Sequence, residues 1–570
     1  MKSKIIIFKT LLLIGLALSS SCEQDLGDNF AQTELTEATF FKTSNDFKLY
    51  SNNYYGSLPA HGLWGREDWS DLTTSVNGNV ISRGEHVTGF NSGVWDNSYA
   101  LIRSTSTLIE KIEEADSELR SSIGQYKGES HFFRGMAYFN LLRQFGGVPL
   151  IDHTLSIDSQ ELNAPRNSRE EIVAFIISEL KLATDHLLLK DELGGDDNGR
   201  VTKGAAFAFL SRVALFEGTW QKYHGGSDSQ RLLQEAITAS EQVMNDTYEL
   251  FDRRDVLGDD NYKYLFTLDK KQANPANLTK SDNNEFILSA RRDLDEKPHN
   301  SRPDPVNGLN PTKKLVDMFL CTDGLPVESS PLFKGKSKID SEYENRDSRM
   351  LMSVPLTVYY NSQQAAWTRN WSDLNDPTRG TLNLVEIPGR TATGYITLKF
   401  MLENEQPNGS DYPVIRLAEV LLNFAEATYE LNGSISDGDL DKSVNQLRER
   451  VGLPSLTNAF VAENGLNMLN EIRRERAVEL FAEGFRYDDL RRWKTAETEL
   501  PKPMLGIKYG GTEWETHENW ASLTPNLDAE GFIIVDPASN RRFDPKKHYL
   551  FPLPLRQLQL NDELEQNPGW

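Results

Sequence analysis

Apolar residues spaced three or four positions apart recur through the first half of the chain, and this spacing constrains the fold most strongly. Phe47 and Tyr50, for example, fall on one face of a helix. One such stretch stops at Gly146, a helix-stop residue, and another begins at Ser168, three residues before Glu171, which is a capping-box pattern. The spacing predicts helices over residues 47–58, 95–112, 132–142, 168–187, 202–217 and 231–246.

The second half of the chain is less regular. Asn, Asp, Pro and Gly cluster between about residues 250 and 410, which predicts long loops, a few short strands and one helix at 313–320. Small residues such as Ala418 and Ala425 on the later helices allow close approach, which favours a mainly α fold of tetratricopeptide-like helix pairs. Helices are predicted at 413–431, 440–451 and 466–483, and a loop-rich segment at 500–550.

The start of the chain has the pattern of an export signal. Lysines precede an apolar run at 11–18, and three serines stand directly before Cys22. The run is too short to span the ~30 Å of hydrocarbon in a bilayer. We therefore expect residues 1–21 to be a signal peptide and residues 22–36 a tether that is lipidated at Cys22. The alternative is an ordinary secretory signal that leaves Cys22 unmodified, because serine replaces the usual leucine three residues before the cysteine.

The chain is strongly acidic, with 61 Lys and Arg against 84 Asp and Glu and a net charge of −23. Nucleic acids and anionic membrane surfaces need a basic footprint, so we expect neither as a partner. The charge also disfavours a strongly anionic polysaccharide, unless a local basic patch overrides it. With Cys22 lipidated, Cys321 has no disulfide partner in the chain and is expected to be a small buried apolar residue.

Known catalytic motifs are missing from the sequence. It contains no HExxH helix, no GxSxG elbow and no CxxC pair. Carboxylates are numerous, but no pair stands out as the two opposed acids that a glycosidase needs. We therefore predict no catalytic residue, no metal site and no cofactor, and keep a lipid-anchored glycosidase as the alternative from another class.

Tryptophans in polar, loop-like contexts are the remaining candidates for ligand binding. An indole face stacks on the C–H face of a sugar ring, and neighbouring Arg or Asn side chains bind hydroxyl groups. The alternative is that the tryptophans have a structural role and pack the loops against the helical body. The residues predicted to bind a glycan are Trp64, Arg66, Trp69, Arg83, Asn97, Trp367 and Trp371, with Trp95 added although its helical spacing is typical of a core residue.

Seven segments along the chain carry distinctive motifs. The helix RGMAYFNLL at 134–142 runs into GGVPL at 146–150. The other segments are GRVTKGAA at 199–206, IRLAEVLLNFAEA at 415–427, EIRRER at 471–476, EGFRYDDLRRW at 483–493, YLFPLP at 549–554 and NPGW at 567–570. In this order they resemble the SusD/RagB family of outer-membrane lipoproteins, and the first is similar to the family's hallmark helix. We interpret the charged residues Arg473 to Arg476 as paired charges that fix helix packing rather than as catalytic groups.

The resemblance implies a SusD-like fold in which four tetratricopeptide-like helix pairs support a loop-rich ligand face with a few short strands. Residues 37–250 are then the N-terminal half and 251–570 the C-terminal half, with ligand residues in 61–97 and 289–371. It further implies a non-catalytic protein on the outside of the outer membrane that passes an oligo- or polysaccharide to a SusC-like TonB-dependent β-barrel transporter. The alternative within the family is a RagB-type protein that captures oligopeptides.

Overall fold

The computed structural model describes residues 40–59, 64–75, 77–269, 274, 276–299, 309–361, 366–368, 379–383, 391–401, 408–518 and 520–570. The predicted signal peptide, Cys22 and the tether lie outside these residues. Across the described part of the chain, no helix combines the length and the apolar character that crossing a bilayer requires.

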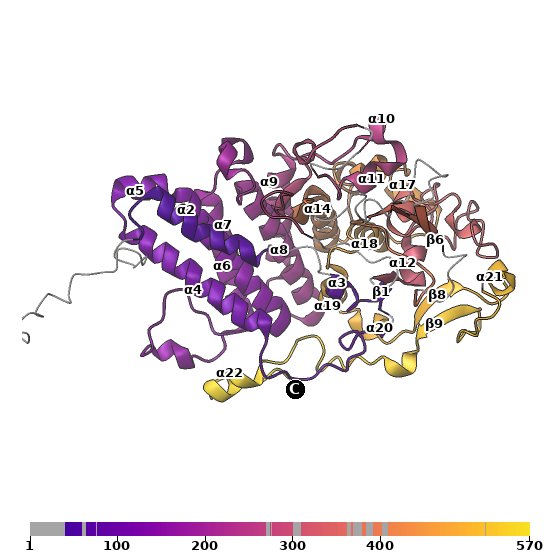
Figure 1. Ribbon diagram of the computed structural model, residues 1–570. Helices are drawn as coiled ribbons and strands as arrows, with labels where there is room; N and C mark the ends of the chain where they lie inside the picture. The colour runs from indigo at the N-terminus through magenta and orange to yellow at the C-terminus, as the bar shows by residue number, and fades with distance from the viewer. Residues whose placement is uncertain are drawn as a thin grey trace, which may run out of the picture.

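Helices build the N-terminal half, and each helix predicted there is confirmed. The first continues from α2 into a 3₁₀ turn at Asn53–Ser57. Figure 1 shows α4, α6 and α7 as neighbouring ribbons at one end of the molecule. The helices are α2 (Ser44–Asn52), α3 (Trp64–Glu67), α4 (Gly93–Glu114), α5 (Ser117–Ser122), α6 (Gly124–Phe145), α7 (Arg169–His186), α8 (Lys203–His224) and α9 (Ser229–Met244).

Local sequence signals set the ends of α6 and α7. Gly146 caps α6 with a φ of 78°, a conformation that favours glycine. A Cβ on Gly147 would lie 2.1 Å from the Asn167 carbonyl oxygen, so only glycine fits there. The predicted capping box is present: Ser168 Oγ accepts from the Glu171 N–H at 3.2 Å, and Glu171 Oε2 accepts from the Ser168 N–H at 2.7 Å.

The second half contains more helix than predicted. The helix expected at 313–320 is α12, but α10, α11 and α13 also occur in the segment predicted to hold a single helix. The helix expected at 413–431 begins only at Leu417. The helices are α10 (Arg254–Leu257), α11 (Asn261–Tyr264), α12 (Lys313–Met318), α13 (Ser348–Ser353), α14 (Leu417–Asn432), α15 (Asp437–Asp441), α16 (Val444–Arg450), α17 (Asn458–Glu463), α18 (Met468–Glu479), α19 (Arg486–Arg492), α20 (Ala496–Glu499), α21 (Glu513–Thr516) and α22 (Leu555–Leu560).

The strands are short and antiparallel, and two of the pairs, β1–β3 and β2–β7, join segments that are far apart in the sequence. The pairs are β1 with β3, β2 with β7, β4 with both β5 and β6, and β8 with β9. The β8–β9 ribbon lies in the segment predicted to be loop-rich. The strands are β1 (Thr73–Thr74), β2 (Phe286–Ala290), β3 (Asn310–Pro311), β4 (Thr357–Asn361), β5 (Ala366–Thr368), β6 (Arg379–Asn383), β7 (Tyr412–Arg416), β8 (Met504–Lys508) and β9 (Phe532–Asp536).

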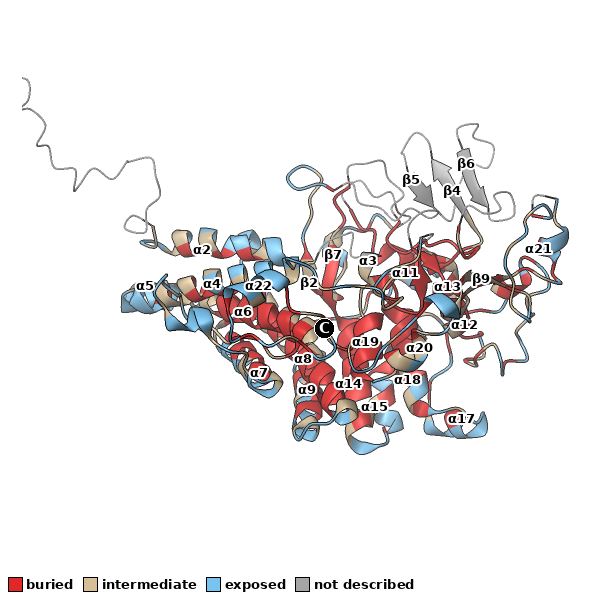
Figure 2. Cartoon of the chain, turned by 90° about the horizontal axis from the view of Figure 1, so that it is seen from below, coloured by how far each residue is buried: buried red, intermediate tan, exposed pale blue. Residues whose placement is uncertain are grey.

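The long helices form one continuous packed array. From α6 to α9 each helix packs against the next, α4 packs against α6, and α9 then contacts α14, which contacts α18. Figure 2 shows that buried residues concentrate in α6, α8, α14 and α19, whereas α5, α17 and α22 carry exposed surface. One apolar cluster includes residues from both halves, from Phe47 to Leu564. The division at residue 250 stays a prediction.

A buried ion cluster joins four chain segments around Glu479 at the end of α18. Its carboxylate accepts hydrogen bonds from Arg416 of β7 at 2.6 Å, Arg450 of α16 at 2.5 Å and Arg349 of α13 at 2.8 Å. Burial by itself raises the pKa of Glu479, but the three arginines and Lys399 outweigh it and hold the pKa well below its usual range. The cluster fixes a strand and three helices relative to one another.

The segment 473–476 has the structural role predicted for it. Arg473 pairs with Glu430 of α14 at 2.8 Å, and Arg476 pairs with Asp489 of α19 at 2.9 Å. These contacts confirm that paired charges fix helix packing here. Cys321 is buried and free, also as predicted.

Candidate functional site

A cavity of about 740 Å³ lies between the N-terminal helices and the C-terminal half. One wall consists of α4, α6 and α8, and the other of β7, α19 and the loop that precedes α19, with α3 between the two. In Figure 1, α19 lies beside α8, and α3 lies beside α19, near the centre of the molecule. Gly93, Asn97 and Ala100 of α4 are exposed and line the cavity, so its rim opens to solvent.

The N-terminal wall carries polar groups on an apolar background. Met136, Phe139, Asn140 and Arg143 follow the three-or-four spacing of one helix face, so all four side chains of α6 line the cavity. Asn97 of α4 adds a second amide at the rim. With Gln144 of α6, three amides and a guanidinium are thus available to hydrogen-bond a ligand that enters between α4 and α6.

Three arginines converge on Asp488 of α19. Arg66 Nη2 and Arg143 Nη1 both donate to its Oδ2, at 3.0 and 3.1 Å, and Arg491 donates to Oδ1. Burial by itself raises the pKa of Asp488, but the three arginines hold it well below its usual range. One negative charge is therefore surrounded by three positive charges.

Trp69 lies beside Arg66 at the same cavity. Its ring packs edge-to-face on Tyr487, with a centroid distance of 5.6 Å, and lies 5.8 Å from the ring of Phe551. The Arg66 guanidinium lies 5.2 Å from the Trp69 ring centroid. The structure therefore brings together Arg66, Trp69 and Asn97, three of the residues predicted to bind a glycan.

Arg83 and Trp95, which were also predicted to bind a glycan, do not line this cavity. Arg83 donates two hydrogen bonds to Asp536 at the end of β9, Nε to Oδ2 at 2.9 Å and Nη2 to Oδ1 at 3.0 Å. Trp95 is 5% exposed and packs against Tyr99 and Phe145, with centroid distances of 5.0 and 5.4 Å. In this structure Arg83 connects distant segments and Trp95 is a core residue.

The other three tryptophans are described only in part. Trp64 begins α3, and Trp367 lies in β5 opposite Tyr360 of β4. The side chains of Trp64 and Trp367, and the whole of Trp371, lie outside the described residues. Their role in ligand binding stays a prediction.

Two acidic residues between Arg66 and Trp69 have raised pKa values. Burial raises the pKa of Glu67 to about 7, although its Oε1 accepts a hydrogen bond from the Gly484 N–H. Its Oε2 is buried without a hydrogen-bond partner among the described residues. Burial also raises the pKa of Asp68 to about 6. Glu67 therefore changes its charge close to neutral pH.

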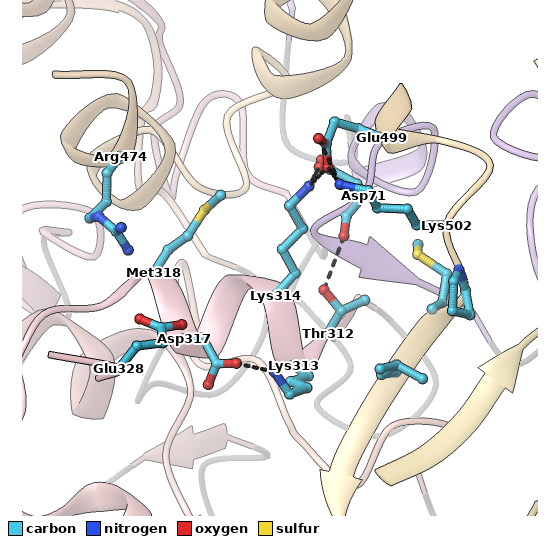
Figure 3. Close-up of a pocket in the computed structure, with 13 residues that line it drawn as sticks. Asp71, Thr312, Lys313, Lys314, Asp317, Met318, Glu328, Arg474, Glu499 and Lys502 are labelled. Atoms are coloured by element: carbon cyan, nitrogen blue, oxygen red, sulfur yellow. Dashed lines mark hydrogen bonds and ion pairs between the residues drawn. The ribbon is translucent and has the colours of Figure 1, made fainter. Parts of the chain in front are cut away.

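A second cavity, of about 390 Å³, lies between α12 and β8 (Figure 3). Lys314 bridges Asp71 and Glu499, and Lys313 pairs with Asp317 at 2.5 Å. Positive and negative charges balance in this cavity. Its basic residues are Lys313, Lys314, Arg474 and Lys502, and its acidic residues are Asp71, Asp317, Glu328 and Glu499.

Residues 259–570, more than half of the chain, match the family model described as "SusD family". The chain belongs to the SusD family. Residues 67–215 of this SusD-family chain match a second model, described as "Starch-binding associating with outer membrane". The resemblance found in the sequence is confirmed. Because SusD-family proteins are non-catalytic binding proteins, the prediction that the chain is not an enzyme is confirmed as well.

Relatives and solved structures of the SusD family cover nearly the whole chain. It is 25% identical to the SusD-like protein P2 of Formosa agariphila over 594 aligned residues, which span all of both chains. A SusD-like protein from Bacteroides fragilis superposes with a TM-score of 0.71 at 24% identity, covering 94% of this chain and 99% of the other. A SusD-like carbohydrate-binding protein from the same organism superposes with a TM-score of 0.70 at 22% identity, covering 92% of this chain and 100% of the other. These likenesses confirm the mainly helical SusD-like fold.

Sequence reasoning did not single out Asn140, Arg143 or Asp488, which also line the cavity. All three lie in or next to segments that resemble the SusD family, and those segments were used to identify the fold. The available signal was in α6, where Asn140 and Arg143 are polar and share the spacing of Met136 and Phe139. Polar residues on the lining face of such a helix indicate a ligand as well as a fold.

Proposed function

We propose that the chain is a non-catalytic glycan-binding lipoprotein of the cell surface, which captures an oligo- or polysaccharide and delivers it to a SusC-like TonB-dependent transporter. The observation that carries this proposal is the solvent-open cavity lined by Arg66, Trp69 and Asn97 in a SusD-family fold. An indole beside guanidinium and amide groups suits a sugar, which offers C–H faces and hydroxyls together. The names of a matched family model and of a solved relative, which refer to starch and carbohydrate, also support it.

The proposed location is the outer leaflet of the outer membrane, with the lipid on Cys22 as the anchor. The sequence pattern before Cys22 supports the anchor, and the description of the second family model supports association with the outer membrane. A tethered protein at this place holds its ligand next to a transporter in the same membrane.

An oligopeptide is the second candidate ligand. An extended peptide binds most simply by adding a strand to a free sheet edge. β7 lines the cavity, but its Val414 carbonyl already accepts a hydrogen bond from Arg212 Nη2 at 2.7 Å. This use of the strand's backbone disfavours edge pairing at β7 and leaves a glycan as the first candidate.

A pair of alanines allows a direct test of the cavity. Ala100 of α4 is exposed and lines the cavity, whereas Ala174 of α7 is exposed and does not. Ala100→Trp fills the rim without removing a hydrogen bond or an ion pair, and Ala174→Trp is the matched control. Each variant, in a Cys22→Ser background that cannot be acylated, is titrated by calorimetry with laminarin, starch and uronate oligosaccharides and with a peptide digest.

We expect one class of glycan to bind, with affinity lowered at least about tenfold by Ala100→Trp and unchanged by Ala174→Trp, since a blocked site loses its ligand contacts. Binding of peptides alone would replace the glycan proposal with peptide capture. Glycan binding that is insensitive to Ala100→Trp would move the site elsewhere on the molecule.

A further inference from the structure

The cavity has a charge balance opposite to that of the whole chain. The chain carries a net charge of −23, but arginines outnumber carboxylates among the residues that line the cavity. The second cavity shows no such surplus. The cavity-lining charges are Arg66, Arg143, Arg212, Arg476 and Arg492 against Glu483, Asp488 and Asp489.

Some of these arginines are neutralised by partners behind the cavity wall. Arg212 donates to both carboxylate oxygens of Glu419 at 2.6 Å. Arg492 is paired in the same way with Glu426, with 2.7 Å from Nη2 to Oε2. These pairs leave little hydrogen-bonding capacity for a ligand, so the surplus of charge belongs to other residues.

Arg66 and Arg143 account for the surplus of positive charge in the cavity. Both donate to the same oxygen of Asp488, which Arg491 also neutralises. Arg66 Nε is buried without a hydrogen-bond partner in the described part of the chain. Among the described residues, the Arg143 side chain makes no other hydrogen bond, and it is 26% exposed where it lines the cavity. Several N–H donors thus stand ready for an acceptor that the protein does not supply.

The electrostatics agree with this geometry. Burial and the positive charges of Arg66, Arg491 and Arg212 together lower the pKa of Arg143 to about 9, although Asp488 partly offsets them. Arg143 stays protonated at neutral pH, held near three other cations. An added negative charge would relieve their mutual repulsion.

We infer that Arg66 and Arg143 bind an acidic group, a carboxylate or a sulfate, on the glycan that this chain captures. The inference rests on the proposed function and narrows its substrate class. A guanidinium matches the planar or tetrahedral oxygens of such groups with two parallel hydrogen bonds. The net charge of the chain does not prevent this, because charges farther than about 8 Å away are largely screened at physiological salt.

Arg143→Gln is the variant that separates this role from a structural one. Asp488 keeps Arg66 and Arg491 as partners after the substitution, so no carboxylate is left uncompensated. Arg103→Gln, at an exposed position of α4 outside the cavity, is the matched control. Arg143→Lys keeps the positive charge but lacks the planar guanidinium that can donate two parallel hydrogen bonds, and it serves as a second variant. Thermal unfolding is recorded for all three variants.

The ligands are matched pairs on one glycan array: oligogalacturonates and their methyl esters, carrageenan oligosaccharides and their desulfated forms, and neutral laminarin and starch oligomers. We expect the acidic member of a pair to bind and its neutral form to bind much more weakly. Arg143→Gln lowers affinity for the acidic member roughly 10- to 100-fold, with little effect of Arg103→Gln and a steep loss of binding as salt rises. The uronate and sulfate pairs show which acidic group is recognised.

Failure of the inference and failure of the proposed function give different results. Binding to neutral glycans, or equal binding to both members of a pair that Arg143→Gln does not change, overturns the acidic-group inference and leaves glycan capture intact. Binding only to peptides, or to no member of the array, overturns both.

Discussion

At the residue scale, the protonation of Glu67, next to the cavity residue Arg66, makes the stability of the fold depend on pH. Burial raises the pKa of Glu67 to about 7 from an ordinary value of 4.5. Between pH 4.5 and about 7, Glu67 is protonated in the folded protein but ionised in the unfolded chain. The stabilisation from protonated Glu67 is therefore complete below pH 4.5 and is lost as the pH rises through 7.

Replacing Glu67 with Gln keeps a neutral side chain at all pH values and retains an acceptor for the Gly484 N–H. We expect Glu67→Gln to be more stable than the wild type by about 1–3 kcal/mol at pH 8, with the difference disappearing towards pH 5. Urea unfolding at pH 5 to 8.5 measures this. Glu85→Gln, at an exposed position, is the control. A stability difference that does not change with pH would contradict the raised pKa.

Single residues were predictable from the sequence where local context decides their role. Trp95 was predicted to bind a glycan but is in the core, as its helical spacing indicated, whereas Asn97, two residues later, lies on the exposed face at the cavity. Arg83 was not predictable, because its partner Asp536 is 453 residues away. Asp488 was missed for the same reason: its contact with Arg66 spans 422 residues.

At the element scale, the Glu479 cluster holds α13, α16, α18 and β7 together. Glu479→Gln leaves three buried arginines with one carboxylate fewer, and breaking a buried ion pair from one side costs about 3–5 kcal/mol. We expect a loss of unfolding free energy of that size in denaturant titrations, with the fold retained at low denaturant.

Glu113→Gln is the matched control for the Glu479 substitution. Glu113 pairs with Lys127 on α6, but its side chain is half exposed, so its loss is expected to cost less than about 1 kcal/mol. Equal effects of the two substitutions would show that the buried cluster does not determine how these elements pack.

The helices of the first half were predictable as elements, as was the presence of a few short strands in the second half, but the pairing of the strands was not. Gly146, Ser168 and Glu171 signal helix ends within a few residues, so α6 and α7 follow from local chemistry. β7 was taken as the start of α14 because its apolar residues run on into the helix, and Pro413 is acceptable in a first helical turn. Its identity as a strand depends on β2, more than a hundred residues earlier.

At the scale of the whole molecule, we propose that the lipid anchor at Cys22 fixes the protein to the membrane. We expect the wild-type chain in the membrane fraction of lysed cells and Cys22→Ser in the soluble fraction, because a lipid on Cys22 is the proposed anchor. Cys321→Ser is the control, since Cys321 is buried and is not a site for acylation. Fractionation followed by immunoblotting measures this. Recovery of Cys22→Ser with the membranes would refute the anchor.

The contacts between distant segments at the cavity also determine when the cavity can form during folding. Arg66 of α3 meets Asp488 of α19 only after 422 further residues have been made. A chain that ends before α19 lacks one wall of the cavity and holds Arg66 and Arg143 without the carboxylate of Asp488. Contacts between such distant segments form late in folding. The cavity is therefore complete only after α19 has joined the N-terminal helices, when most of the chain is already present.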